Sequence, residues 1–235
     1  MNYYDLMITQ GWGLALGLAA LVTLAVSVSA LCVGAVFGVL AAWSKLAGGR
    51  TLHIVADTYT TVLRGIPDLL VIYLFYFGGS SALGAIGRLF GYDGFIGLPA
   101  FATGAIAVGL ISGAYQAEVY RGANLFIAKG ELEAARAVGM NRMLLFRRII
   151  LPQALRFAIP GLGNCWQMAL KESALISVTG LVELLRQSYI AAGSTRRPFD
   201  FYITAAILYL AVTWASTYLF QRAERYSMRG LRRTS

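Results

Sequence analysis

The stretch "GWGLALGLAALVTLAVSVSALCVGAVFGVLAAWS", residues 11–44, contains no Asp, Glu, Lys, Arg or His. A helix needs only about 20 apolar residues to cross the hydrocarbon core of a bilayer, so this run is long enough to span a membrane. The segment before it carries no basic residue, and the run is too long for the apolar region of a signal peptide. We therefore expect a first transmembrane helix that is retained in the mature protein.

The composition of the whole chain supports a membrane protein. Its 235 residues are 58% hydrophobic and 13% charged, with a mean hydropathy of +0.65, which exceeds what a soluble domain buries in one core. Four further apolar runs follow the first, at residues 54–77, 98–119, 157–181 and 201–220. The sequence predicts one all-α integral membrane domain over residues 1–235, with five transmembrane helices.

The distribution of basic residues predicts the orientation of these helices. If the N-terminus lies outside, 14 of the 20 Lys and Arg residues fall in inner segments, four in outer segments and two within spans. Basic residues concentrate on the cytoplasmic side of membrane proteins, so we expect the N-terminus outside and the C-terminus in the cytoplasm. The basic tail at about residues 222–235 then faces anionic membrane lipid, and no nucleic acid partner is expected.

The long inner segment at about residues 124–156 has the pattern of a helical elbow. Residues 129–138 are good helix formers, and Gly139 is placed to end that helix in a left-handed turn. Asn141 can cap a second helix whose apolar residues lie opposite three arginines, and prolines bound the segment that returns to the membrane. The residues alone leave two alternatives, an amphipathic linker on the inner leaflet or a docking element for a cytoplasmic partner.

The elbow also carries a recognisable motif. "EAARAVG" followed by "RRIILPQALRFAIPGLGN" resembles the EAA loop of the membrane subunits of ATP-binding-cassette (ABC) importers. The resemblance implies a type I ABC importer permease fold. It also implies that the loop couples the membrane helices to an ATPase through Glu133, Ala134, Ala135, Gly139, Leu151 and Pro152.

The resemblance extends over most of the chain and narrows to the polar amino acid uptake family, of histidine and opine type. The segments that carry it are "LRGIPDLL" (63–70), "SGAYQAEVYRGA" (112–123), "PGLGNCWQMALKESAL" (160–175) and "RPFDFYITAAILYLAVT" (197–213). It implies a multi-pass permease of the bacterial inner membrane for polar amino acids. The Pro67–Asp68 pair implies a heterodimer with a sister permease, and a homodimer is the alternative.

The chain has no nucleotide site of its own. No G-x-x-x-x-G-K-[ST] sequence occurs in it, so the loop that cradles nucleotide phosphates is missing. We expect this chain to bind no cofactor and not to be an enzyme. The resemblance implies a cytoplasmic ABC ATPase dimer that binds ATP and magnesium. It also implies an extracytoplasmic binding protein that delivers substrate to outer loops at about residues 79–97 and 182–200.

Several ionisable residues fall within the predicted spans, where each costs about 2.5–3.5 kcal/mol at mid-membrane. Arg64 and Asp68 are spaced to pair along one helix if it continues through Pro67, and Glu118 can pair with Arg121. Structural pairing is the favoured interpretation of both. Lys171 and Glu172 are adjacent and point about 100° apart on a helix, so they need other partners.

Polar residues near Glu172 form a candidate substrate site. The segment "PGLGN" permits a broken helix beside a cavity, and carboxylates and amides suit a cationic amino acid or opine. An equally weighted alternative is a polar contact between helices in a dimer core. The candidate substrate-binding residues are Asn164, Gln167 and Glu172, with Asp68 and Glu118.

Other kinds of site receive little support. His53 is the only histidine and has no neighbours at metal-ligand spacing, and both cysteines lie in apolar segments that suit packing. We expect no metal site and no catalytic residues. The favoured function is the permease subunit of an ATP-driven amino acid importer. The alternative is an ion-coupled secondary carrier or channel, against which five spans without an inverted repeat argue.

Overall fold

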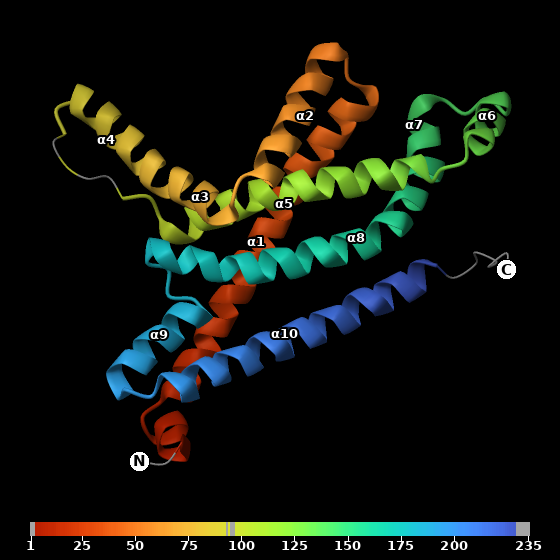
Figure 1. The fold of residues 1–235 in the computed structure, drawn as a ribbon. Coiled ribbons are helices and arrows are strands. Elements are labelled where there is room, and N and C mark those ends of the chain that lie inside the picture. Colours follow the sequence, from red (N-terminus) through yellow and green to blue (C-terminus); the bar gives the residue numbers. More distant parts are fainter. Residues whose placement is uncertain (1–2, 93, 95–96, 229–235) are drawn as a thin grey trace.

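The computed structural model describes residues 3–92, 94 and 97–228, and all regular elements in these ranges are helices (Figure 1). Shorter π-helical and 3-10 segments join or precede them at Asp5–Thr9, Leu74–Gly78, Phe146–Ile150 and Ser173–Thr179. The α-helices are α1 (Trp12–Ala47), α2 (Arg50–Gly65), α3 (Asp68–Tyr73), α4 (Gly79–Leu89), α5 (Ala100–Leu125), α6 (Lys129–Ala137), α7 (Arg142–Leu145), α8 (Leu151–Glu172), α9 (Leu184–Thr195) and α10 (Pro198–Ser227).

Four helical segments in the described ranges are long and apolar enough to cross a membrane: Trp12–Ala47, Asp68–Leu89, Ala100–Leu125 and Pro198–Ser227. The first, third and fifth predicted runs are therefore confirmed as apolar helices α1, α5 and α10. Most of the fourth predicted run lies in α8, which is not among the four and contains both polar and charged residues. The count of five spans stays a prediction.

The second predicted run is interrupted. Helix α2 ends at Gly65, Ile66 and Pro67 adopt extended ψ angles of 141° and 130°, and a new helix begins at Asp68. Proline has no N–H to donate and disfavours helical geometry in the residue before it, which explains the break. The apolar segment runs instead from Asp68 through Leu74–Gly78 into α4, so helix occupies much of the predicted outer loop.

The C-terminal predictions also differ from the structure in detail. The second predicted outer loop contains helix α9. Helix α10 continues to Ser227, so the beginning of the predicted basic tail is helical, whereas residues 229–235 lie outside the described residues.

Helices α1 and α5 cross at close range, and glycines make the contact possible (Figure 1). A Cβ atom added to Gly109 of α5 would lie 2.6 Å from Cγ1 of Val33, and one added to Gly34 of α1 would lie 3.0 Å from the Gly109 carbonyl oxygen. The buried Gln116 side chain reaches across the crossing, where Nε2 donates to the Leu31 carbonyl oxygen at 3.2 Å. Small residues allow this backbone approach between membrane helices.

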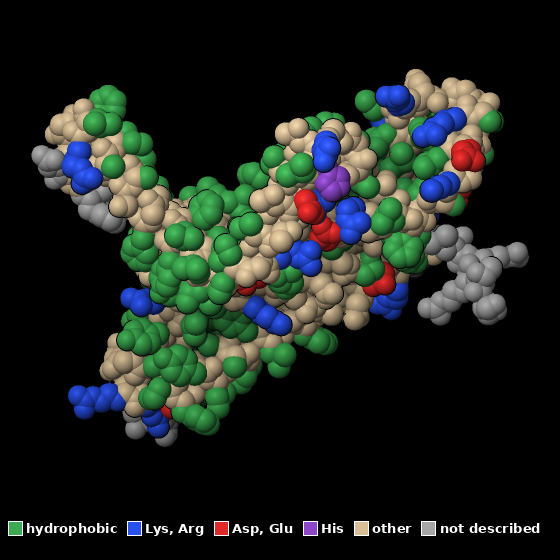
Figure 2. Space-filling model, turned by 45° about the horizontal axis from the view of Figure 1, so that its top comes forward, with side chains coloured by type: hydrophobic (Ala, Val, Ile, Leu, Met, Phe, Trp, Pro, Cys, Tyr) green, Lys and Arg blue, Asp and Glu red, His purple; other side chains and the backbone are tan. Residues whose placement is uncertain are grey.

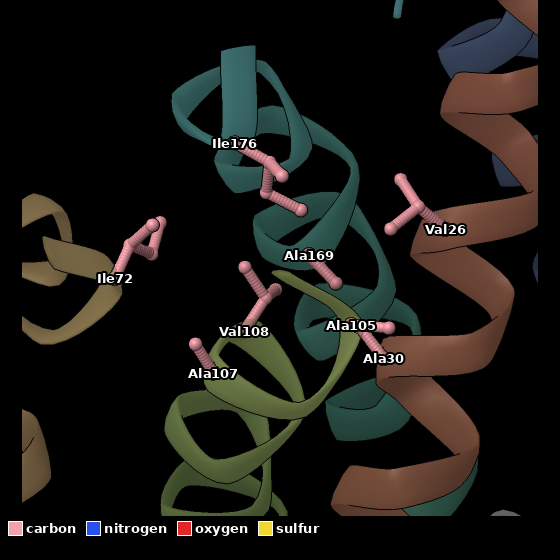
Figure 3. Close-up of a cluster of buried hydrophobic side chains, with 8 residues drawn as sticks. All are labelled: Val26, Ala30, Ile72, Ala105, Ala107, Val108, Ala169 and Ile176. Carbon is pink, nitrogen blue, oxygen red and sulfur yellow. The ribbon is translucent and has the colours of Figure 1, made fainter. Parts of the chain in front are cut away.

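The crossing is continued by a core of small and branched side chains. Figure 3 shows these side chains converging from α1, α3, α5, α8 and the 3-10 segment that follows α8, and most of them are fully buried. They are Val26, Ala30, Ile72, Ala105, Ala107, Val108, Ala169 and Ile176. A second buried cluster joins the N-terminal part of α1 to α9 and α10. The two clusters hold α8, α9 and α10 around the α1–α5 pair.

Glu183 joins α9 to α1 and α10. Its side chain is fully buried at the N-terminus of α9, where Oε1 accepts the Arg186 N–H at 2.7 Å and Oε2 accepts the Leu185 N–H at 2.9 Å. Oε2 also accepts the Tyr209 hydroxyl of α10 at 2.9 Å. Thr23 of α1 contacts the same carboxylate at 3.5 Å. The carboxyl group thus accepts hydrogen bonds from α1, α9 and α10, and nothing in the local sequence pattern predicts this arrangement.

We expect Glu183→Ala to destabilise the protein because it leaves buried donors of α9 and α10 without an acceptor. Each unsatisfied buried group costs about 1–3 kcal/mol. The melting temperature of the purified protein in detergent should fall by several degrees. The decrease should be smaller for Glu183→Gln, because one acceptor oxygen remains. Glu224→Ala, which removes a less buried carboxyl from α10, is the matched control. Equal melting temperatures for Glu183→Ala and this control would contradict the assignment.

Candidate coupling and substrate sites

The predicted elbow is present. Helix α6 ends at Ala137, Gly139 has a φ of +82°, and Oδ1 of Asn141 accepts the Leu144 N–H at 2.9 Å. The left-handed turn and the cap are therefore confirmed. The second helix is longer than expected, because α7, the π-helical segment and α8 run without a break through Pro152 and Pro160.

One face of α6 is open to solvent. Glu133 and Ala134 are exposed, whereas Ala135 turns inward and is buried. Leu151 and Pro152 are also exposed at the start of α8, and Gln153 donates to the Glu131 carboxylate, which fastens α6 to α8. Helix α6 stands at one end of the molecule, away from the crossing helices (Figure 1). A small-residue face in this position can be approached closely by another chain.

A buried lysine links three helices behind the elbow. Nζ of Lys45 on α1 lies 2.7 Å from Oε1 of Glu118, 3.0 Å from Oδ1 of Asp57 and 2.6 Å from Oγ1 of Thr60. Arg121 binds the other oxygen of Glu118 at 2.8 Å, so the predicted Glu118–Arg121 pair is confirmed. The side chain of Lys45 is only 5% exposed. Two cations therefore already hold Glu118, the least available of the candidate substrate-binding carboxylates.

The lysine network ties the α1–α2 corner to the end of α5. Helix α5 ends at Leu125, and α6 begins at Lys129. Figure 2 shows acidic and basic side chains gathered together on the face that carries this corner. The connection between α5 and the elbow is short, so a displacement of α6 reaches the network through one helix end.

Two of the candidate substrate residues meet. Asp68 at the start of α3 and Glu172 at the end of α8 lie close enough for their carboxyl groups to interact. Glu172 is 7% exposed, and its Oε2 receives no hydrogen bond from the described residues. Nε1 of Trp166 on the same helix is also buried and unpaired within the described chain. Two carboxylates in contact repel each other unless a proton or a cation lies between them.

The remaining polar candidates point elsewhere. Asn164 is exposed on α8, and Nε2 of Gln167 donates to Oγ1 of Thr217 on α10 at 3.2 Å. Helix α8 is unbroken through the "PGLGN" segment. Arg64 does not share a helix with Asp68, and its guanidinium instead lies 5.3 Å from the centre of the Tyr115 ring. The acidic pair is thus the part of the predicted set that the structure brings together.

The described residues contain no group of three His, Cys, Asp or Glu side chains that could hold a metal ion. His53 is exposed, and both cysteines are free thiols.

Comparisons with known proteins agree with this arrangement. Residues 34–230 match the family described as "Binding-protein-dependent transport system inner membrane component". The chain is 58% identical to the octopine transport system permease protein OccQ of Rhizobium meliloti, over 99% of each chain. It is 37% identical to the histidine/lysine/arginine/ornithine transport system permease protein HisQ of Escherichia coli, over 91% of this chain and 93% of that protein. A crystal structure of an amino acid ABC transporter with histidines matches with a TM-score of 0.79 and 32% identity, over 96% of this chain and 100% of that one.

The lysine network predicts energetic coupling between α1 and α5. Lys45→Met and Glu118→Gln should each lower the melting temperature. The double variant should lower it by less than the sum of the two single shifts, because both changes remove the same contact. Lys45→Arg should retain most of the stability. Fully additive shifts would show that the two side chains do not interact.

Proposed function

The chain belongs to the family of inner membrane components of binding-protein-dependent transport systems, and from this premise we propose its substrate, its partners and its way of coupling. It is a multi-pass inner membrane permease subunit of an ABC importer. Its relatives are named for the transport of octopine and of histidine, lysine, arginine and ornithine. The proposal is import of a cationic amino acid, or of an opine made from one.

The acidic pair is the observation that supports this substrate class. Asp68 and Glu172 place two carboxyl groups together within the membrane domain, and Oε2 of Glu172 still lacks a donor among the described residues. A guanidinium group offers several N–H donors in one plane and matches carboxylates in bidentate geometry. A cationic substrate group would therefore relieve the repulsion between the acids and supply the missing donor. Asn164 and Gln167 stay weaker candidates for its polar ends.

The elbow is the proposed site of coupling to the ATPase. The open face of α6 around Glu133 and Ala134 would enter a groove of a cytoplasmic ATPase dimer, with Gly139 setting its angle. Ala135, Leu151 and Pro152 would support that face from behind. ATP and magnesium belong to the partner, since this sequence has no phosphate-binding loop. Closure of the ATPases would move α6, and α5 and α8 would carry that movement to the acidic pair.

The proposed assembly has the N-terminus outside and five helices crossing the membrane. Helix α8 is the crossing helix that brings the number to five. An amphipathic helix can cross a membrane when its polar face, here with Glu172, is turned towards protein. The ends that carry α4 and α9 lie opposite α6 and α7, which suits an external binding protein on one side and the ATPase on the other (Figure 1). A sister permease completes the pathway as a heterodimer, with a homodimer as the alternative.

ATP dependence tests the transporter class. The chain, reconstituted in proteoliposomes with its ATPase, sister permease and binding protein, should take up labelled arginine or octopine only with ATP. Gly139→Val should abolish most uptake, because a β-branched residue is strained at a φ of +82° and would misdirect α6. The control is Gly130→Ala on α6, where the backbone φ is not positive and no side chain is nearby. Uptake without ATP, driven by an ion gradient and insensitive to Gly139→Val, would instead establish a secondary carrier.

The acidic pair predicts how substrate affinity changes. Glu172→Gln and Asp68→Asn should each raise the half-saturating concentration of a cationic substrate about 10- to 100-fold. The reason is that a charge-assisted hydrogen bond contributes about 1.5–3 kcal/mol. Basal ATPase activity and complex yield should remain unchanged. Gln167→Ala, on the same helix but bonded to α10, serves as the control. Unchanged half-saturation in both acidic variants would remove the pair from the substrate site.

A further inference from the structure

A large apolar groove lies between the first membrane helix and the elbow. Its volume is about 1160 Å³, which exceeds the range of about 300–1,000 Å³ common for small-ligand pockets. The cytoplasmic end of α1 forms one wall, the elbow and the start of α8 form the other, and the end of α5 forms the floor. The proposed function assigns no ligand to this groove.

Both walls are apolar. From α1 come Val39, Trp43 and Leu46, which are 53%, 59% and 43% exposed, and from the elbow come residues such as Phe146, which is 47% exposed. Contiguous exposed apolar surface of this kind marks a site of contact with another molecule or with membrane. Since α1 is an apolar helix of spanning length, its wall lies where lipid chains are available. The part of the occupant that lies between these two walls must therefore be apolar.

The polar residues at the groove define the other end of the occupant. Arg136 and Arg142 line it together with Asn124 and Asn141, and none of the lining residues is acidic. Neither arginine forms an ion pair with a carboxylate within the described residues. Figure 2 shows Lys and Arg side chains gathered over the α6–α7 end of the molecule beside hydrophobic side chains. The occupant must therefore carry negative charge at one end.

We propose that this groove binds an anionic phospholipid of the inner leaflet. An acyl chain lies between α1 and the elbow, and the phosphate lies at Arg136 and Arg142. Anionic lipids attract basic side chains at the cytoplasmic surface by about 1 kcal/mol per residue, and guanidinium groups match phosphate oxygens well. The lipid touches both a membrane helix and the coupling elbow, so its occupancy stabilises one position of α6. Binding is independent of the proposed function, whereas this effect on coupling rests on it.

Native mass spectrometry of the full chain tests the binding directly. The protein is titrated with phosphatidylglycerol and, separately, with phosphatidylcholine of the same acyl chains. We expect tighter retention of phosphatidylglycerol, and Arg136→Gln/Arg142→Gln should weaken it about tenfold or more. Arg147→Gln/Arg148→Gln is the matched control, because these arginines carry the same charge on the same elbow but do not line the groove. Equal losses in the two double variants would show general surface attraction and overturn the proposal.

A second variant tests the apolar wall without altering the charge. Ala47→Trp fills the exposed end of the groove on α1 and should reduce phosphatidylglycerol retention while both arginines remain. In the assembled transporter, phosphatidylglycerol nanodiscs should raise ATPase activity relative to phosphatidylcholine, and the groove variants should lose this difference. Retention that persists unchanged in Ala47→Trp would overturn the proposal. Retention that disappears when the sister permease or the ATPase assembles would also overturn it, and would assign the groove to a protein partner.

Discussion

The close crossing of α1 and α5 is the contact on which the rest of the structure depends. Lipid tails are as apolar as leucine, so membrane helices gain little from hydrophobic burial and must pack backbone against backbone. Gly34 and Gly109 allow this approach, and the buried Gln116 adds hydrogen bonds across it. The α1–α2 hairpin then joins α5 through Lys45 and Glu118, and α8 packs against α5 where Gly161 meets Val119.

Helix α5 connects the two candidate sites. Near its N-terminus Gly104 packs against Ile176, which follows Glu172 in the chain, and near its C-terminus Glu118 belongs to the lysine network. The same helix leads into α6. A helix of this length spans nearly 40 Å at about 1.5 Å per residue, and its hydrogen bonds keep it stiff. In the proposed mechanism, α5 is the element that would carry a tilt at the elbow to the packing near Glu172.

Short sequence patterns predicted the features that depend on residues close together in the chain. A left-handed glycine and a capping asparagine define the elbow within a few residues, and long apolar runs define α1 and α5. The lysine network and the acidic pair join residues far apart in sequence, so spacing along one helix could not reveal them. The sequence identified Asp68 and Glu172 as candidates because charge is costly in a membrane, but only the fold shows that they meet.

The break at Pro67 explains why Arg64 does not pair with the acidic residues. On a continuous helix Arg64 would lie one turn from Asp68 and neutralise it. The extended residues Ile66 and Pro67 separate the two side chains, and Arg64 lies over the Tyr115 ring instead. Asp68 is thereby left to face Glu172. The helix break thus leaves Asp68 and Glu172 without a cationic partner among the described residues, which is the condition that the proposed substrate site requires.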